Sequence, residues 1–194
     1  MIIVGTEEAA VERDLVNGIL KCPNCRSSLR PWGHGIEREV RLSQTTERRR
    51  FRRSICRSCL STHVLVHEDT LVRRRDCAEV IGMALLAKVG GHGHRRIAHA
   101  ISRPQSTVRG WLRRFASRAA PIWEHFVRWA HAVDPTHEDR SVGGSSFSDA
   151  VSAIGVLGMV ATRRFGTRPV WGIASVVTGG GLLGNTSSLF RAPV

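Results

Sequence analysis

The sequence lacks the features that mark exported and membrane-spanning proteins. Its first ten residues, MIIVGTEEAA, carry neither a basic segment nor a long apolar core, so we expect no signal peptide. The longest apolar run, from Ala150 to Ala161, is too short to span a bilayer and is interrupted by Ser152 and two glycines. Five cysteines, an odd number, argue against a disulfide framework. We therefore expect a soluble, cytoplasmic protein whose cysteines are reduced.

The sequence also lacks the patterns of common catalytic and nucleotide-binding sites. No Gly-Lys-Ser or Gly-Lys-Thr follows the triple glycine at 179–181, so this is not a phosphate-binding loop. No pairing of a nucleophile with a base stands out. A transposase-type catalytic domain, which holds two metal ions on three carboxylates, needs more room than the 79 residues after Phe115. Five acidic residues lie in that segment: Glu124, Asp134, Glu138, Asp139 and Asp149. We therefore expect no enzymatic activity.

Acidic residues and lysines are scarce, whereas arginine is abundant. Of the 29 basic residues only Lys21 and Lys88 are lysines, and 16 acidic residues leave a formal net charge of +13. Arginine suits bidentate contacts to phosphate and guanine, although GC-rich genomes also favour it. The excess is most one-sided between Asp76 and Phe115, where seven basic residues stand against two acidic ones. This charge indicates a polyanionic partner.

Two CxxC pairs, Cys22-Pro-Asn-Cys25 and Cys56-Arg-Ser-Cys59, are separated by 30 residues. Each pair can form a tight knuckle whose thiolates point at one metal ion, and two knuckles complete a tetrahedral four-thiolate site. The spacing predicts a structural Zn²⁺ ion, which would supply folding free energy to a module with little core. An iron–sulfur cluster is an alternative for the same ligands. Redox chemistry fits poorly because no βαβ pattern surrounds either pair, and four protein ligands leave no open position for a catalytic zinc.

The spacer between the two pairs predicts a β-hairpin. Apolar residues alternate over 36–42 and 51–66, and a polar turn lies near 43–47. The arginine run at 48–53 would place basic side chains on both faces of an exposed strand. Phosphate contact and protection of an edge strand from aggregation both explain it, and both interpretations stay open.

The remaining cysteine and the histidines predict no further metal site. Cys77 lies outside both pairs and is expected to be a small buried residue. His34, His63 and His67 lie near the knuckles, and we expect structural roles or contacts to the ligands at most. The pair at 92 and 94 lies in a glycine-rich stretch, which predicts a plain loop.

After Leu71 the apolar period changes from two residues to about 3.6, which predicts helices. The first apolar stripe contains Ala78, Ile81, Leu85 and Val89, and the glycines at 90–93 end that helix. A helix-turn-helix is predicted over 95–115. Its first helix carries Ile97, Ala98 and Ile101, and Ser102-Arg103-Pro104 interrupts the pattern because proline cannot continue a helix.

The second helix of this pair would begin near Gln105. Its inward side chains are Val108, Leu112 and Phe115, with Trp111 on the flank. The outward positions, from which glutamine and arginine can contact adenine and guanine edges, are Gln105, Ser106, Arg109, Gly110 and Arg113. The expected phosphate contacts are Thr107, Arg95, Arg96, Arg103 and Arg114. The predicted partner is double-stranded DNA, and the alternative is a helical bundle that binds nothing.

The predicted fold is mainly α with a small β zinc ribbon. We expect a lead-in over 1–20, the four-cysteine ribbon over 21–70 and a helix-turn-helix domain over 71–117. A connecting helix (118–133), a polar linker (134–146) and a C-terminal helical unit (147–194) follow. That last unit is expected to serve packing or oligomerisation. The more economical alternative is that it docks on the helix-turn-helix domain.

One stretch of motifs resembles a known family. CPNC, PWGHG, CRSC and THVLV, followed by RRIAHAISRPQSTVRGWLRRF, resemble a family of uncharacterised zinc-ribbon and helix-turn-helix proteins, which are similar to the N-terminal DNA-binding regions of insertion-sequence transposases. The resemblance covers Lys21 to Phe115 and implies DNA binding and a mobile-element context. Related ribbons often carry glycine after each CxxC, where this chain has Arg26 and Leu60.

These observations predict a sequence-specific double-stranded DNA-binding protein, acting as a transcriptional regulator or a transposition accessory factor. One alternative is the DNA-binding subunit of a split or degenerate transposase, whose partner would be a separate integrase or transposase protein. Another is a zinc-stabilised module that binds RNA or an acidic protein. A homodimer fits, because a single helix-turn-helix buries little surface. We expect no membrane partner and no small-molecule substrate.

Overall fold

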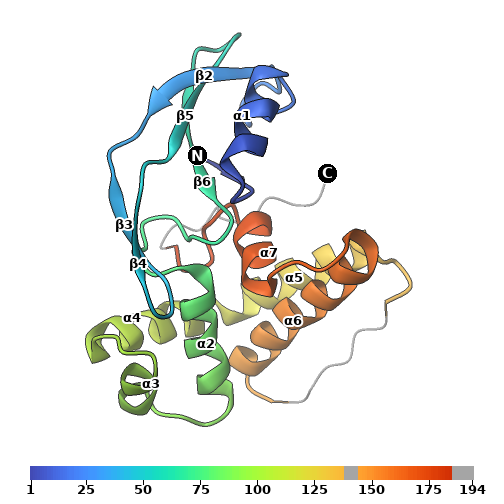
Figure 1. Cartoon of the computed structure of the whole chain (residues 1–194). Helices are drawn as coiled ribbons and strands as arrows, with labels where there is room; N and C mark the ends of the chain where they lie inside the picture. Colours follow the sequence, from blue (N-terminus) through green and yellow to red (C-terminus); the bar gives the residue numbers. More distant parts are fainter. Residues whose placement is uncertain (138–143, 185–194) are drawn as a thin grey trace.

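The computed structural model describes residues 1–137 and 144–184 (Figure 1). Residues 138–143 of the predicted linker and 185–194 of the predicted C-terminal unit lie outside the described residues. The described residues form six strands, gathered at one end of the molecule, and seven helices. Among these helices, none is long and apolar enough to cross a lipid bilayer.

The main sheet has four strands in the order β1-β6-β5-β2. β2 (Leu29–His34), β5 (Arg52–Cys56) and β6 (Thr62–His67) pair in antiparallel fashion, while β1 (Ile2–Val4) joins β6 in parallel. The predicted apolar stretch over 51–66 is thus two strands, because the second CxxC pair forms the turn between them. The residues predicted to be a lead-in contribute an edge strand to this sheet.

A second, two-stranded hairpin continues from the main sheet. β3 (Arg38–Arg41) and β4 (Thr46–Arg49) pair from Arg38 with Arg49 to Arg41 with Thr46. The turn is closed by a hydrogen bond from the Leu42 N–H to the Thr45 carbonyl at 2.8 Å. The polar turn predicted near 43–47 therefore lies slightly too late, since β4 already begins at Thr46.

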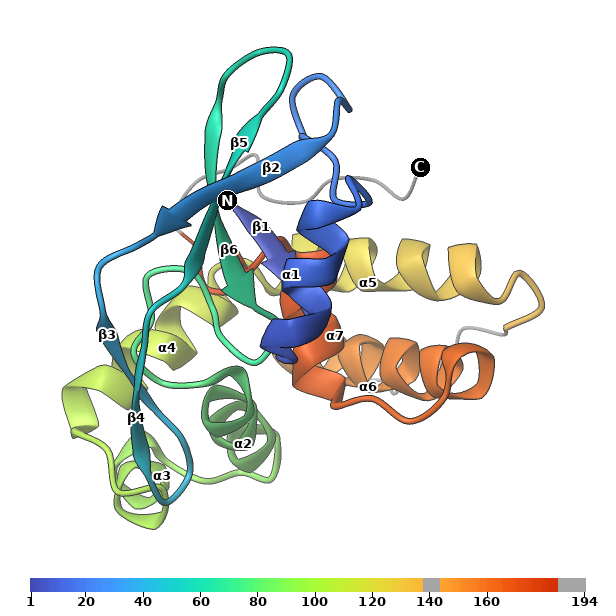
Figure 2. The ribbon, with the colours of Figure 1, turned by 45° about the horizontal axis from the view of Figure 1, so that its top comes forward.

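One face of the main sheet is covered by α1 (Glu8–Val16), as Figure 2 shows. Val11 and Leu15 of this helix share a small buried cluster with Leu29, Leu65 and two of the CxxC cysteines. The predicted ribbon therefore has a core of its own, and residues N-terminal to the ribbon supply part of it.

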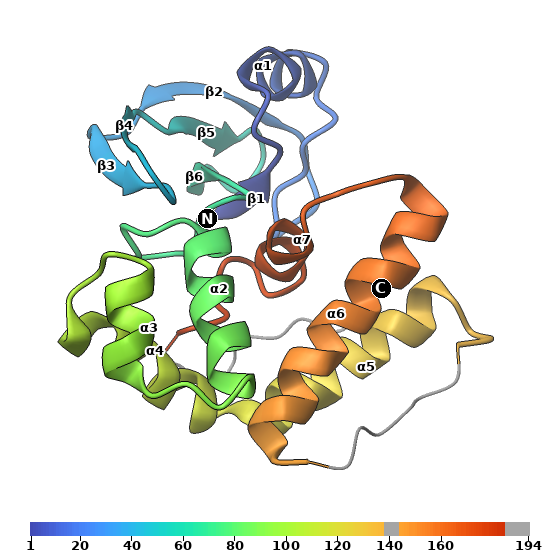
Figure 3. The ribbon, with the colours of Figure 1, turned by 60° about the horizontal axis from the view of Figure 1, so that its bottom comes forward.

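The helices surround a second, larger core. They are α2 (Ala78–Val89), α3 (His94–Ala100), α4 (Gln105–Ala116), α5 (Ala119–Val133), α6 (Ser146–Phe165) and α7 (Val170–Val177). In Figure 3, α5 and α6 pack against each other beside α2 and α7. One buried cluster runs from Val40 of the hairpin through these helices to Leu183. The C-terminal helices therefore pack on α2 and α4 within the same core.

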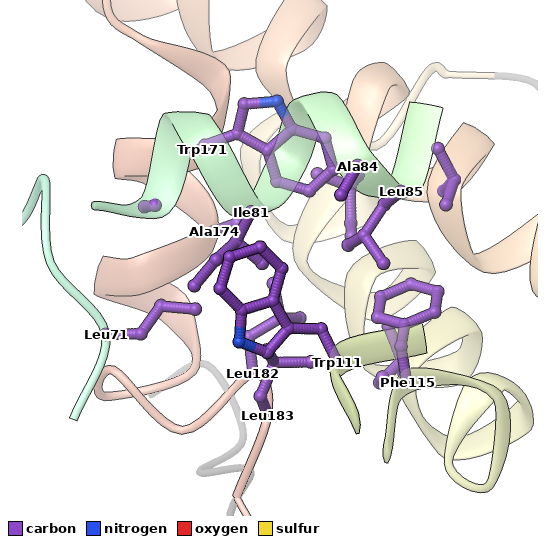
Figure 4. Packing of buried hydrophobic residues seen from close by; sticks show 14 of the residues in the cluster. Leu71, Ile81, Ala84, Leu85, Trp111, Phe115, Trp171, Ala174, Leu182 and Leu183 are labelled. Carbon is purple, nitrogen blue, oxygen red and sulfur yellow. The ribbon is translucent and has the colours of Figure 1, made fainter. Parts of the chain in front are cut away.

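Two tryptophans show how closely the helices of this core pack (Figure 4). Trp111 of α4 is only 3% exposed and lies next to Leu182 and Leu183, so the flank of the helix on which it was predicted is buried as well. The buried apolar surface of α4 is wider than expected, because the C-terminal segment with Leu182 and Leu183 covers the side of the helix that carries Trp111. Trp171 of α7 lies against Gly82 of α2, where an added Cβ would lie 2.0 Å from the indole ring. This glycine therefore permits the close approach of α2 and α7.

Candidate metal centre and nucleic-acid interface

The two CxxC pairs come together at the end of the main sheet. The Sγ atoms of Cys22, Cys25, Cys56 and Cys59 all lie within 4.8 Å of one another. Across the two pairs, Cys22 Sγ is 3.6 Å from Cys59 Sγ, and Cys25 Sγ is 3.4 Å from Cys56 Sγ. A metal–sulfur distance of about 2.3 Å in a tetrahedron places the sulfurs roughly 3.8 Å apart. A disulfide requires about 2.05 Å. The four thiols are therefore arranged as a candidate metal site.

The two knuckles have the same turn conformation. In each, the N–H of the first cysteine donates to the carbonyl five residues later, at 2.8 Å in the first knuckle and 3.0 Å in the second. The residue after each CxxC adopts a left-handed backbone, with φ of 60° at Arg26 and 59° at Leu60. Glycine favours this conformation, whereas other residues adopt it at a cost. The chain thus adopts this turn in both knuckles with Arg26 and Leu60, not glycine, at the left-handed position.

The pKa values of two of these thiols, Cys59 and Cys25, are shifted in opposite directions from the ordinary value for cysteine. Hydrogen bonding with Ser61 lowers the pKa of Cys59 to about 6. The pKa of Cys25 is raised to about 11: the Ser27 N–H lowers it, but hydrogen bonding with Cys56 and burial outweigh that effect. Four thiolates this close repel one another, and a cation among them stabilises all four in the ionised form. The four thiols are therefore compatible with a metal site.

Groups around the thiols orient them. The Ser58 N–H donates to Cys56 Sγ at 3.4 Å. His63 is buried, and its Nε2 atom lies 3.5 Å from Cys22 Sγ, which agrees with the predicted contact to a ligand. Burial also lowers the pKa of His63, which favours the neutral ring. His34 and His67 lie elsewhere, in a groove of about 410 Å³ between α1 and the arginine run.

Cys77 is separate from this cluster. It precedes α2 as its N-cap residue and is buried in the larger core. Burial raises the pKa of its thiol, so the side chain is neutral. The prediction of a small buried residue is confirmed.

The arginine run at 48–53 divides into structural and free side chains. Arg49 donates to Asp69 at 2.7 and 2.8 Å. Arg52 forms a bidentate pair with Glu12 of α1, at 2.7 and 2.9 Å, and this hydrogen bonding lowers the pKa of the Glu12 carboxyl. Arg53 makes no ion pair with any residue in the described part of the chain. Arg49 and Arg52 therefore join their strands to Asp69 and to α1, whereas Arg53 is available to bind a ligand.

Most residues predicted to contact DNA lie together on α3 and α4. The turn between the helices spans 101–104, and α4 begins at Gln105, where the pattern predicts it. The exposed residues of this set are Gln105, Ser106, Arg109, Arg113, Arg95 and Arg96, while Thr107, Gly110 and Arg114 are half-buried. The inward side of α4 is formed by buried Val108, Trp111, Leu112 and Phe115.

Arg103 is the exception, and its assignment as a phosphate contact is corrected. Its side chain is only 9% exposed and its guanidinium donates to the Asp76 carboxylate and, at 2.6 Å, to the Leu42 carbonyl. Asp76, itself 3% exposed, also lies 3.4 Å from Arg41. Arg103 therefore ties the α3–α4 turn to the β3–β4 hairpin, a role that sequence reasoning missed. The signal available was Asp76, a rare acidic residue within the most basic segment.

The exposed arginines of α3 and α4 have no such partners. Within residues 1–137 and 144–184, Arg95, Arg96, Arg109 and Arg113 form no ion pair and no side-chain hydrogen bond. Each therefore keeps its full donor capacity for an external acceptor.

No protein-family model, curated protein or solved structure matches this chain.

Proposed function

We propose that this protein binds double-stranded DNA in a sequence-specific manner through α3 and α4, without chemistry of its own. In this proposal α3, the turn and α4 form a helix-turn-helix, and α4 enters the major groove. The observation that carries the proposal is the set of exposed, unpaired arginines gathered on α3 and α4. In contrast, Arg49, Arg52 and Arg103 are each held by a carboxylate.

The side chains divide by what they can recognise. Gln105, Arg109 and Arg113 are exposed along one side of α4, and their side chains suit bidentate contacts to adenine or guanine. Arg95 and Arg96 on α3 are suited to phosphate contacts that orient the protein without specifying sequence. Two short polar side chains, Ser106 and Thr107, add hydroxyl donors in the first turn of α4.

The metal site serves this function indirectly. We infer that it holds a structural Zn²⁺ ion, because four thiolates in a tetrahedral arrangement are its preferred structural ligands. The ion would stiffen the main sheet, from which the β3–β4 hairpin continues. The Arg103–Asp76 pair and the Leu42 carbonyl then fix the hairpin against the α3–α4 turn. A transcriptional regulator and a transposition accessory factor both need such a module.

The test begins with selection of bound sequences from a randomised duplex pool by the metal-loaded protein. We expect an enriched motif, bound about 10³-fold or more tightly than unrelated duplex at physiological salt. Arg109→Ala and Arg113→Ala should relax the motif at single positions. Arg95→Ala should weaken all duplexes alike and reduce the slope of log K against log salt by about 0.9.

The matched control is Arg13→Ala, which removes an exposed arginine from α1, far from α4 (Figure 1). It should leave both the motif and the salt slope nearly unchanged. Equal affinity for every duplex would refute sequence-specific recognition. Failure of the folded, metal-loaded protein to bind any duplex would refute the proposal as a whole.

A further inference from the structure

One face of the main sheet is covered by α1. The outer part of the opposite face is left uncovered. Residues alternate between faces along a strand, so Leu29 and Leu65, which pack with α1, define the covered face. Arg30 and Trp32 of β2 belong to the opposite face. In β5, Arg53 and Ile55 belong there too, since Ile55 pairs with Arg30.

Trp32 is an unusual residue on this open face. Its side chain is 49% exposed, although indole rings are normally well buried. The strand pairing shifts between Pro31 and His34, so that Trp32 and Gly33 together lie opposite Arg53. Gly33 has φ of 73°, a conformation that glycine adopts without strain. Such bulges turn a side chain out of the regular pleat and are frequent at binding sites.

Two arginines occupy strand positions next to Trp32 on this face, Arg30 two residues earlier on β2 and Arg53 opposite on β5, and neither is neutralised. Arg30 is exposed, Arg53 is half-buried, and neither forms an ion pair or side-chain hydrogen bond within the described chain. The neighbouring residues on this face, Thr62 and Val64 of β6, carry no charge. An exposed ring with two unpaired arginines at neighbouring strand positions therefore offers stacking and phosphate contacts, and no acidic side chain occupies these strand positions to repel an anion.

We propose that this face binds single-stranded nucleic acid. An unpaired base stacks on Trp32, while Arg30 and Arg53 contact the phosphates on either side of it. An aromatic ring flanked by cations recognises any base through its π-face and tracks the backbone by charge. Paired bases in a duplex have both faces covered by their neighbours, so double-stranded DNA cannot use this ring. The site is distinct from α4 and does not depend on the function proposed for that helix.

The experiment measures fluorescence anisotropy of labelled oligothymidine and oligouridine of about 12 nucleotides, with the full-length, metal-loaded protein. Trp32→Ala should weaken binding of both strands about ten-fold or more, the loss of one stacked base. Trp32→Phe should retain most of the affinity because a smaller ring still stacks. Arg53→Ala should weaken binding and reduce the salt slope by about 0.7.

Two controls separate this site from general effects and from the function of α4. Trp123→Ala removes another exposed tryptophan, on α5, and should leave single-strand affinity unchanged. Arg109→Ala should likewise leave it unchanged, whereas Trp32→Ala should leave duplex binding unchanged. A preference for oligouridine or oligothymidine supports the site and identifies RNA or DNA as its ligand.

Equal affinity of wild type and Trp32→Ala for both oligonucleotides would overturn the proposal. So would an equal loss in Trp123→Ala, because binding would then not be localised to this face. Single-strand binding that depends on Trp32 in a protein that binds no duplex would refute the function proposed for α4 and support this one.

Discussion

The contact between Asp76 and Arg103 allows a quantitative test of how the hairpin and the α3–α4 turn are joined. Asp76→Ala removes a carboxylate that is 3% exposed and pairs with Arg103 and, at 3.4 Å, with Arg41. Arg41 is partly exposed and can be hydrated instead. Arg103 stays buried and keeps only carbonyl partners, Leu42 at 2.6 Å and Ser102 at 3.2 Å among them.

Removing one partner of a buried ion pair typically costs about 3 to 5 kcal/mol, because the remaining charge is left uncompensated. The carbonyls that still accept from Arg103 place the expected loss near the lower limit. Arg103→Ala should cost a similar amount, since Asp76 then keeps only the longer contact to Arg41. The double variant leaves neither charge buried alone, so its cost should fall short of the sum by about 2 kcal/mol.

Urea unfolding of the metal-loaded variants measures these free energies, with an unchanged m-value as the check that the same surface unfolds. A second measurement separates structure from recognition. Arg103→Ala should keep the wild-type salt slope for duplex binding, whereas Arg95→Ala should reduce it by about 0.9. Single-variant losses below about 1 kcal/mol that simply add would refute the reasoning. A reduced salt slope in Arg103→Ala would restore its assignment as a phosphate contact.

Three further predictions concern the metal site and the helical core. Elemental analysis should find one metal ion per chain, and a strong chelator should lower the thermal midpoint; a chelator-insensitive midpoint would exclude a structural metal. Leu60→Gly should stabilise the metal-loaded protein by about 1 kcal/mol in urea unfolding, because Leu60 is 63% exposed and left-handed; a loss would contradict this. Gly82→Ala should lower the free energy of unfolding by about 3 kcal/mol, because the added Cβ clashes with Trp171. The control Gly155→Ala places its Cβ in open space and should stabilise α6 by up to about 1 kcal/mol. Equal effects of the two substitutions would refute the argument that α2 and α7 pack closely at Gly82.

Periodicity predicted the helices well because most of them bury one continuous side. The inward residues Val108, Leu112 and Phe115 are buried as their spacing predicts, and α4 begins at Gln105. The burial of Trp111 on the flank of α4 depends on a second segment, distant in sequence, that covers this side of the helix. Local spacing indicates which residues face inward, but it does not reveal how much of the helix surface later elements will bury.

The elements that the sequence did not predict depend on partners far along the chain. β1 has only three residues, and its pairing with β6 joins positions more than sixty residues apart. The partner of Arg103 was unpredictable for the same reason. A guanidinium binds phosphate and carboxylate equally well, and only the fold brings Asp76 next to Arg103. The four cysteines were predictable because metal-ligand spacing is local within each knuckle.

β6 connects the two cores and thereby relates the candidate metal site to the helices. Leu65 points into the small core that includes Cys22 and Cys56, and the next residue, Val66, points into the larger core around α2 and α4. Loss of a metal ion bound at this site would therefore remove support from one face of β6 only, since the other face keeps its own packing. A metal effect on duplex binding would then act through the position of the hairpin against the α3–α4 turn. Because the Arg103–Asp76 pair makes that contact, chelation and Arg103→Ala should weaken duplex binding non-additively. Additive losses in binding free energy would mean that the metal affects duplex binding independently of this pair.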